Sequence, residues 1–404
     1  MRILVQKFGG SSLTTKQSRE QVISHIIRER NNGYAVVVVV SAMGRLGEPY
    51  ATDTLLELVY SEKEPLSSRE RDLLLCCGET ISAVTLCAML QERGLPAHVY
   101  TGAGAGIITD EQFGNAKILE IRPKALIASL EAGTIVIVTG FQGVSEAGEL
   151  TTLGRGGSDT SATALGAALT AEIVDIYTDV VGVLTADPRI VTGAKPLSAV
   201  SYAEICNLAR EGAKVIHPRA VEIAQQARLP IRIRSTFSED TGTWIGDQVY
   251  TGSEQMLYDR HVTGIAHYSG LTQLTVKSPD QCTDMPLSVF KTMADHQISV
   301  DFIHVTPNKV TYTVFDKDAA KAIKLLRTIG YEPEERKGCA KVSIIGGGMN
   351  GQPGVMAKIV EALTEKNIAI MQSADSNTTI WVLVQGTEME EAVRTLHNKF
   401  ELHK

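Results

Sequence analysis

The sequence predicts an α/β protein in which a mostly parallel sheet is sandwiched by helices and is followed by two smaller α+β units. Residues 1 to about 245 alternate short apolar runs with helical patterns, an order typical of a parallel sheet covered on both faces. Residues 235–254 are rich in Ser, Thr, Gly and Asp, which indicates a boundary. Beyond it, a pattern of apolar residues recurs at an offset of about 70 residues.

Short apolar runs predict the strands of the first part, at Ile3–Phe8, Ala35–Ser41, His98–Thr101, Thr134–Thr139, Ile173–Tyr177 and Ile231–Arg234. The patterns between them predict helices near residues 16–32, 68–93, 116–131, 157–170, 201–210 and 218–228. In sheets of this kind ligands bind at the carboxyl ends of the strands, so the turns there are the places to examine.

The repeat in the second part rests on matched apolar positions. Those of the first copy are Phe290, Met293, Ile298 and Val300, and those of the second are Val360, Leu363, Ile368 and Ile370. Each copy predicts the order strand, helix, strand, strand, helix. A unit this small buries its sheet poorly, so we expect the two copies to share a sheet or to pack as a pair. A chance match between unrelated stretches is the alternative.

Composition excludes several classes of protein. A net charge of −7 argues against a general nucleic-acid binder, which usually carries a basic face. The six cysteines include no C-x-x-C pair, so we expect reduced thiols and no metal-ligand cluster. No apolar run approaches the ~18 residues of a membrane span, and the first residues reach a charge too soon for a signal peptide. We expect a cytoplasmic protein that handles small ligands, with no nucleic acid or membrane as partner.

The run 152–159, Thr-Leu-Gly-Arg-Gly-Gly-Ser-Asp, is the most informative motif. An apolar strand at 135–139 precedes it and a helix of small residues starts at 161–165. The run therefore predicts a connection with free backbone N–H groups at a helix N-terminus, a place that binds anions. Arg155 adds a planar fork suited to a carboxylate or a phosphate. A glycine-rich surface loop is the alternative.

A second motif, Lys-Phe-Gly-Gly-Ser-Ser at 7–12, directly follows the first strand. Two glycines allow the backbone to wrap around phosphate oxygens, and the lysine supplies a positive charge. An ordinary strand–turn–helix connection is the alternative. The chain has no G-x-x-x-x-G-K-[ST] and, after the first strand, no G-x-G-x-x-G, so neither a P-loop nor a dinucleotide fold is indicated.

Together the two motifs resemble those of the aspartate kinases, members of the amino-acid kinase family with tandem ACT regulatory domains. The stretches 177–189 and 212–218 are similar to the nucleotide-binding stretch and the late lysine motif of that family. The resemblance implies an amino-acid kinase domain at 1–245 and two ferredoxin-like ACT domains at 262–337 and 338–404. The chain looks most similar to diaminopimelate-sensitive isozymes.

The resemblance implies the reaction ATP + L-aspartate → ADP + 4-phospho-L-aspartate, which begins the aspartate pathway, with Mg²⁺ carried by ATP. It implies Lys7, Asp159 and Lys214 as catalytic residues, where Asp159 either orients Lys7 or contacts Mg²⁺ or its waters. The residues expected to bind ATP are Lys7, Phe8, Gly9, Gly10, Ser11, Thr178, Asp179, Leu184, Arg189 and Lys214. The alternative for residues Asp187–Arg189 is a plain turn without a role in nucleotide binding. We expect His217 to cap a helix or to pack, rather than to take part in catalysis.

The residues expected to bind aspartate are Ser41, Thr52, Glu79, Arg155 and Ser158. Glu79 lies in an apolar stretch, where an unpaired carboxylate is costly to bury. The alternative interpretation is that Glu79 is an exposed residue on a helix face without a role in binding. The chain departs from the family pattern by inserting Arg45–Ala51 before Thr52, which leaves the role of Thr52 open. A kinase of a related small carboxylate and a non-catalytic amino-acid sensor are the alternative functions.

The resemblance further implies feedback inhibition by diaminopimelate, lysine or threonine, of which we expect diaminopimelate. The residues expected to bind this effector are Asp284, Asn350, Gln352, Pro353, Gly354, Asn367, Ile370 and Gln372. In the first copy, Thr283-Asp284 stands where a Pro-Gly is expected, which leaves the geometry of that turn open. Paired ACT domains imply a homodimer or a higher homo-oligomer.

Overall fold

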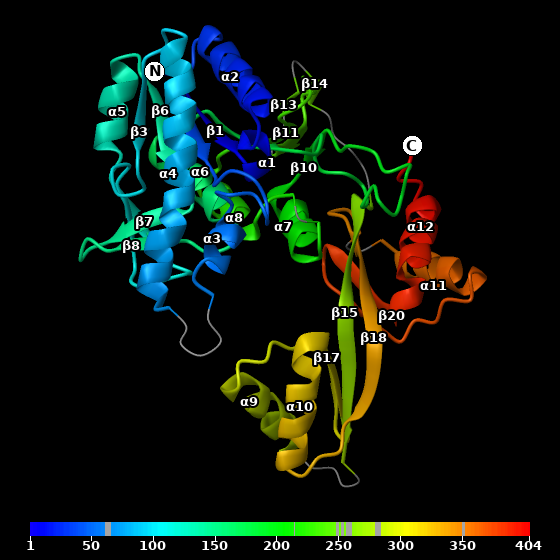
Figure 1. Cartoon of the computed structure of the whole chain (residues 1–404). Helices are drawn as coiled ribbons and strands as arrows, with labels where there is room; N and C mark the ends of the chain where they lie inside the picture. Colours follow the sequence, from blue (N-terminus) through cyan, green and yellow to red (C-terminus); the bar gives the residue numbers. More distant parts are fainter. Residues whose placement is uncertain are drawn as a thin grey trace. The chain divides into compact units, whose positions relative to one another are not determined.

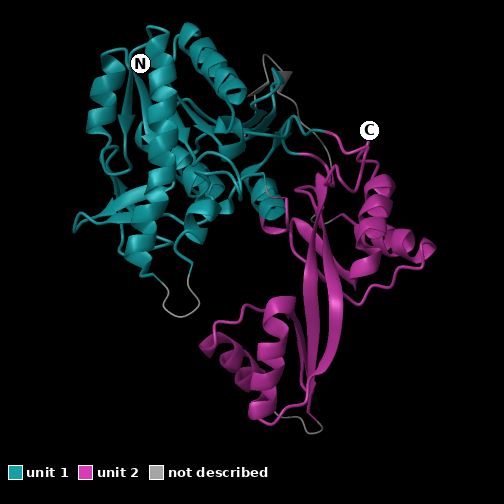
Figure 2. Cartoon of the chain, in the orientation of Figure 1, with its two compact units in different colours: residues 1–183, 196–209, 214–257 teal, residues 184–195, 210–213, 258–404 magenta. Residues whose placement is uncertain are grey.

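The computed structural model describes residues 1–60, 66–213, 215–247, 250–251, 254–255, 261–278, 284–349 and 352–404. The chain divides into two compact units (Figure 2): unit 1 comprises residues 1–183, 196–209 and 214–257, and unit 2 comprises residues 184–195, 210–213 and 258–404. The sequence did not indicate the two short segments of unit 2, because they lie within the stretch whose alternating pattern belongs to the first part.

Unit 1 is built on an eight-stranded sheet in the order β10-β12-β11-β9-β1-β2-β6-β3 (Figure 1). Its pairings are parallel except that of β11 with β12. The strands are β1 (Ile3–Phe8), β2 (Ala35–Val40), β3 (Ala97–Tyr100), β6 (Ile135–Thr139), β9 (Ile173–Thr178), β10 (Ala199–Val200), β11 (Ile231–Ser235) and β12 (Thr243–Ile245). The short strands β13 (Tyr250–Thr251) and β14 (Glu254–Gln255) pair separately.

Helices cover both faces of this sheet, as predicted. On one face α2 and α4 bury Ile23 and Leu86 against Phe8 and Val38 in one core. On the other face α6 approaches so closely that a side chain at Gly166 would contact Val174. The helices are α1 (Gly10–Leu13), α2 (Lys16–Asn31), α3 (Thr52–Glu57), α4 (Ser68–Glu92), α5 (Lys124–Glu131), α6 (Gly157–Ala168), α7 (Tyr202–Arg210) and α8 (Pro218–Ala227).

A second sheet in unit 1 was not predicted. It has the order β5-β4-β7-β8, with strands β4 (Ile107–Thr109), β5 (Ile118–Ile121), β7 (Gln142–Ser145) and β8 (Leu150–Thr152). The helix expected near 116–131 is therefore wrong in its first half. The run 152–159 follows β8 rather than β6, because the hairpin β7–β8 lies between. Strands of three or four residues are too short to show a period of two.

Helix α4 is long and apolar enough, by length and composition, to cross a membrane, and half of that stretch is buried inside the protein. A core helix of a globular protein meets the same criteria. Its buried face carries Asp72 and Glu79, and α4 packs with α2 on the sheet. Its apolar stretch is interrupted at Gly78–Thr80, and its packing is that of a core helix.

Unit 2 contains the two repeats, and each has the predicted order strand, helix, strand, strand, helix. They share one antiparallel sheet in the order β16-β17-β15-β18-β20-β19 (Figure 1). The first repeat is β15 (Gly264–Lys277), α9 (Met285–Asp295), β16 (Asp301–Thr306), β17 (Lys309–Phe315) and α10 (Asp316–Thr328). The second is β18 (Glu334–Ile345), α11 (Val355–Glu365), β19 (Gln372–Asp375), β20 (Thr379–Gln385), a short 3-10 turn (Gly386–Glu388) and α12 (Met389–Lys399).

Each repeat has its own core, as the matched apolar positions require. Val289, Met293 and Val310 lie in the core of the first repeat, and Ile359, Leu363 and Val382 lie in that of the second. The strands β15 and β18 run through both halves and pair with each other, with irregular register near Tyr268. Strand β18 therefore crosses the boundary that we expected at residues 337 and 338.

Candidate active site

The two glycine-containing motifs meet at an ion pair. The Lys7 Nζ atom lies 2.7 Å from Asp159 Oδ1, and both side chains are almost buried, with 13% and 12% of their surface exposed. Lys7 stands near the carboxyl end of β1 and Asp159 in the first turn of α6. The other carboxylate oxygen, Asp159 Oδ2, accepts a hydrogen bond from the His217 N–H at 3.4 Å. Both oxygens of Asp159 are thus engaged by the protein.

Glycine is required where the central motif turns into helix α6. Gly156 caps that helix with a φ of +68°, in the left-handed region. A Cβ atom there would lie 2.2 Å from the Cβ of His217. His217 itself caps α8, because its Nδ1 accepts a hydrogen bond from the Arg219 N–H. Capping is the role expected for His217.

The Lys7–Ser12 motif is held against the turn that follows β2. The Ser41 N–H donates to the Phe8 carbonyl and the Gly44 N–H donates to the Gly10 carbonyl, both at 3.1 Å. A Cβ atom on Gly10 would lie 2.6 Å from the Gly44 oxygen, so only glycine fits this contact. Phe8 was expected to bind ATP, but its side chain is fully buried and stacks on Tyr177. Only its backbone can face a ligand.

Helix α4 supplies two buried carboxylates, seven residues apart and therefore on one face. Asp72 accepts hydrogen bonds from the N–H groups of Gly114 and Thr152 and from the Thr152 hydroxyl. It thereby fixes the start of the run that carries Arg155. Sequence reasoning missed Asp72, because no local pattern distinguishes it from an exposed residue in the first turns of a helix.

Glu79 is the second carboxylate, and only 2% of its surface is exposed. Its Oε1 accepts a hydrogen bond from the Ala42 N–H at 3.0 Å, whereas its Oε2 has no partner among the described residues. Burial raises the pKa of Glu79 to about 7. An unpartnered buried carboxylate oxygen suits an ammonium group, and the exposed alternative for Glu79 is excluded.

The other residues expected to bind aspartate also lie in unit 1. Ser41 follows β2, and Thr52 is the first residue of α3. Ser158 is buried, and a Cβ atom on Gly140 would lie 2.9 Å from its side chain. Arg155 is exposed, and its guanidinium pairs with no carboxylate of the described residues. It is therefore available to a carboxylate from outside the chain.

The residues expected to bind the nucleotide divide between the two units. Thr178 and Asp179 stand at the carboxyl end of β9 in unit 1, where Asp179 forms an ion pair with Arg45 of the inserted segment. Leu184 and Arg189 belong to unit 2. The Arg189 guanidinium pairs with Asp187, whose pKa this hydrogen bond lowers. Lys214 lies outside the described residues.

The expected effector residues flank the turns before α9 and α11 in unit 2. Asp284 and Gly354 are the N-cap residues of these helices, and Gly354 has a φ of +95°. Ile370 packs against the core of the second repeat. The Gln372 amide is already engaged, by Gln273 and by the Phe302 carbonyl. Gln352, Pro353 and Asn367 lie in connecting segments, and Asn350 lies outside the described residues.

Neither of two measurable cavities coincides with the expected residues. One of about 520 Å³ lies in unit 2 and is lined by Lys341, Glu211, Phe302 and Trp381, among others. Another of about 410 Å³ lies in unit 1 near Arg2 and Arg232, at the amino ends of the strands. Within the described ranges, no group of three or more His, Cys, Asp or Glu residues is placed to hold a metal ion.

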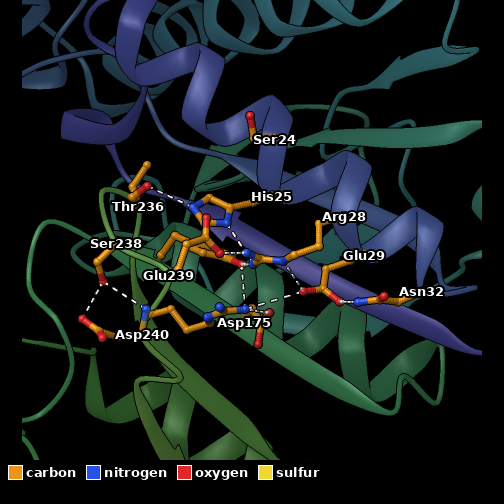
Figure 3. Close-up of polar contacts among 12 residues, drawn as sticks. Ser24, His25, Arg28, Glu29, Asn32, Asp175, Thr236, Ser238, Glu239 and Asp240 are labelled. Atoms are coloured by element: carbon orange, nitrogen blue, oxygen red, sulfur yellow. Dashed lines mark hydrogen bonds and ion pairs between the residues drawn. The ribbon is translucent and has the colours of Figure 1, made fainter.

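A network of charged and polar residues in unit 1 also escaped the sequence analysis (Figure 3). It joins His25, Arg28 and Glu29 of α2 to Asp175 of β9 and to Thr236, directly after β11. His25 and Thr236 are 211 residues apart in the sequence. No local signal links them, because the contact exists only once α2 packs on the sheet.

Comparison with known proteins extends these observations. The model of the amino acid kinase family matches residues 2–235, and an ACT domain model matches residues 334–398. Aspartokinase 1 of Bacillus subtilis is 52% identical over 404 residues, the full length of both chains. Aspartokinase III of E. coli with aspartate and ADP has a TM-score of 0.78 and 26% identity, covering 98% of this chain and 99% of that chain. Its complex with lysine and aspartate has a TM-score of 0.77, with 26% identity and coverage of 99% and 100%.

Proposed function

Because this chain belongs to the amino acid kinase family, as an aspartate kinase with C-terminal ACT domains, we propose that the residues around Lys7 carry its reaction. The enzyme transfers the terminal phosphoryl group of ATP to the side-chain carboxylate of L-aspartate. The single observation that supports this choice of residues is the Lys7–Asp159 contact of 2.7 Å, since it joins two motifs that lie 152 residues apart.

The chemistry needs no general base. The nucleophile is a carboxylate with an ordinary pKa of ~3.9, which is ionised at neutral pH. Catalysis then consists of positioning the reactants and neutralising charge on the transferred group. The Lys7 ammonium supplies that charge. Asp159 orients Lys7, and the engagement of both its oxygens argues against a direct bond to Mg²⁺.

The nucleotide is bound as its Mg²⁺ complex. The backbone N–H groups of Gly9–Ser11 and the start of α1 bind the phosphates, because the open turn after β1 leaves amides free for anions. Thr178 and Asp179 contact the nucleoside, and Asp179 exchanges its ion pair with Arg45 for the ligand. Leu184, Arg189 and Lys214 stay expectations from the family resemblance: the first two belong to unit 2, and Lys214 lies outside the described residues.

The aspartate is held at both ends of its backbone. Its ammonium binds Oε2 of Glu79 and its α-carboxylate binds the guanidinium of Arg155, two groups without an ionic partner among the described residues. The hydroxyl groups of Ser41, Thr52 and Ser158 line the same site. This arrangement suits any α-amino acid, so the length of the side chain decides which carboxylate is phosphorylated.

Replacement of Lys7 by methionine tests this assignment. We expect Lys7→Met to lower kcat by roughly 10²-fold or more, because the charge acts on the transition state. The assay follows ADP release with aspartate and glutamate as acceptors, and hydroxamate formation identifies the acyl phosphate. Lys16→Met, at the exposed start of α2, is the matched control. Normal turnover of Lys7→Met would reject the assignment.

Regulation belongs to the ACT unit. We propose that an amino-acid end product, with diaminopimelate as our first choice, binds at the turn before α11 and inhibits the cytoplasmic enzyme as a homodimer or larger oligomer. A lysine-bound T-state is known for aspartokinase III of E. coli, which supports an amino-acid effector. Titration of activity with diaminopimelate, lysine and threonine tests this, and a flat response to all three would reject it. Light scattering measures the oligomer.

A further inference from the structure

His25 is connected through Thr236 and Ser12 to the turn that we assign to the ATP phosphates, and its hydrogen bonds define its protonation state. Its Nδ1 lies 2.9 Å from Arg28 Nη2, and its Nε2 lies 2.9 Å from the Thr236 carbonyl oxygen (Figure 3). A guanidinium can only donate and a carbonyl can only accept. Nδ1 is therefore the acceptor and Nε2 carries the proton, so the imidazole is neutral. Only 1% of the residue is exposed, and burial lowers the pKa of His25.

Thr236 transmits this contact to the phosphate turn. Its Oγ1 lies 2.6 Å from the Ser12 Oγ, and both residues are fully buried. The Ser12 N–H donates to the Gly9 carbonyl at 3.0 Å. The Thr236 N–H donates to the Thr178 carbonyl at 2.9 Å. One residue thus joins His25 to both segments expected to bind the nucleotide, Gly9–Ser11 and Thr178–Asp179.

The surroundings of His25 hold balanced charges, three cations and three anions. On its own helix Arg28 pairs with Glu29 at 3.2 Å and with Glu239. From β9 and β11, Asp175 accepts two bonds from Arg232 at 2.8 Å, and Arg234 lies 3.6 Å from Glu29. The Tyr177 hydroxyl lies within 3.4 Å of Arg28 and Arg234, and its ring packs on that of His25.

Protonation of His25 would disturb this balance in two ways. It would add a fourth cation beside Arg28 and Arg234. It would also turn Nδ1 into a donor that faces a donor, because an imidazolium has no acceptor. The hydrogen bond to Arg28 would be lost, although Nε2 could still donate to the Thr236 carbonyl. The ring and the Arg28 guanidinium would have to move apart, which would disturb the position from which the ring supports Thr236.

We propose that His25 is a positioning residue for the nucleotide: its neutral form holds Thr236, and through Thr236 and Ser12 it holds the Gly9–Ser12 turn in the conformation that binds ATP. The inference rests on the proposed assignment of that turn to the ATP phosphates. His25 itself touches no reacting atom. Its effect therefore falls on the affinity for ATP and on the dependence of that affinity on pH.

Two substitutions separate this role from a general contribution to packing. His25→Gln keeps one donor and one acceptor without a titrating group, whereas His25→Leu keeps the bulk and removes both. At pH 7.5 we expect the KM for ATP to rise about tenfold in His25→Leu, which is the effect of losing the buried hydrogen bond to Thr236, and to stay within about threefold in His25→Gln. Ser24→Ala, on the exposed side of the same helix, should behave as wild type.

The pH profile gives a readout that a merely structural role would not change. In the wild type we expect the KM for ATP to rise only when the pH falls below the range in which an ordinary histidine gains its proton, because burial lowers the pKa of His25. In His25→Gln this acid limb should be absent. The KM for aspartate, which depends on Glu79, should keep one pH profile in all three proteins and serves as the internal control.

Two results would overturn the inference: an unchanged KM for ATP in folded His25→Leu, or an unchanged acid limb in His25→Gln. If His25→Leu fails to fold, Thr236→Val supplies the test. It removes the hydroxyl bond to Ser12, through which His25 acts on the turn, so the KM for ATP should rise and the acid limb should weaken; a wild-type KM would refute the route. Lys7→Met distinguishes failure of the proposed site from failure of this inference. Normal turnover of Lys7→Met rejects the proposed site itself. Impaired turnover of Lys7→Met, together with His25 variants that behave like the wild type, rejects only this inference.

Discussion

Glu79→Gln offers the sharpest test of the aspartate site, because it removes a charge and keeps the shape. The glutamine oxygen can still accept the Ala42 N–H. What is lost is the ionic partner for the substrate ammonium at Oε2, which has no other partner among the described residues. A hydrogen bond to a charged group contributes about 1.5–3 kcal/mol, so the KM for aspartate should rise about 10- to 150-fold at pH 8.

The pH dependence follows from the same carboxylate. With a pKa of about 7, Glu79 is mostly ionised at pH 8 and only about one-tenth ionised at pH 6. The wild-type KM for aspartate should therefore rise about tenfold between pH 8 and pH 6, whereas that of Glu79→Gln should change little. Steady-state kinetics at saturating ATP measure both. Glu92→Gln, an exposed carboxylate at the end of α4, is the matched control.

Stability supplies an independent check. The pKa of Glu79 is raised in the folded state, from 4.5 to about 7, so the folded protein binds this proton more tightly than the unfolded chain. Its contribution to stability is present below pH 4.5 and is lost as the pH rises to about 7, a difference of about 3 kcal/mol. Thermal unfolding without ligand should show wild type losing stability relative to Glu79→Gln over this range.

A pH-independent KM for aspartate in the wild type would refute the assignment of Glu79 to the substrate ammonium.

Two further predictions concern packing. Gly10→Ala should lower kcat/KM for ATP by about 10²-fold, because the new methyl group meets the Gly44 and Ala42 oxygens and displaces the turn. Gly104→Ala, where a methyl group meets only ordinary contacts, is its control, and equal kinetics of the two would contradict the account. In unit 2, Lys341→Met should cost about 3 kcal/mol in urea unfolding, since it strands the buried Glu211 carboxylate, which lies 3.0 Å from the ammonium. Glu211→Gln should cost less, because Asp301 still pairs with Lys341, and the reverse order would refute this explanation.

Much of the fold was predictable because its signals are local. Runs such as Ala35–Val40 are apolar throughout, as a strand buried on both faces requires. The repeat in unit 2 was visible because each copy needs the same apolar positions for its own core. The four-stranded sheet was missed, since its strands are too short to show a period.

The candidate site divides in the same way. Lys7, Arg155 and Asp159 stand in motifs whose glycines and charges already indicate phosphate and carboxylate chemistry. Asp72 and His25 carry no such signal. Each is an unremarkable position on a long helix until it meets a partner far along the chain, Thr152 for Asp72 and Thr236 for His25.

The sequence alone determined six strands of the main parallel sheet, which turns can bind anions and which family the chain resembles, because periodicity, glycine and charge act over a few residues. Only the tertiary structure decided that Lys7 meets Asp159, that one buried oxygen of Glu79 has no partner among the described residues, and that His25 is hydrogen-bonded to the Thr236 carbonyl. Those facts depend on strand order and on the packing of α2, α4 and α6 against the sheet. Such packing joins residues that no local pattern relates.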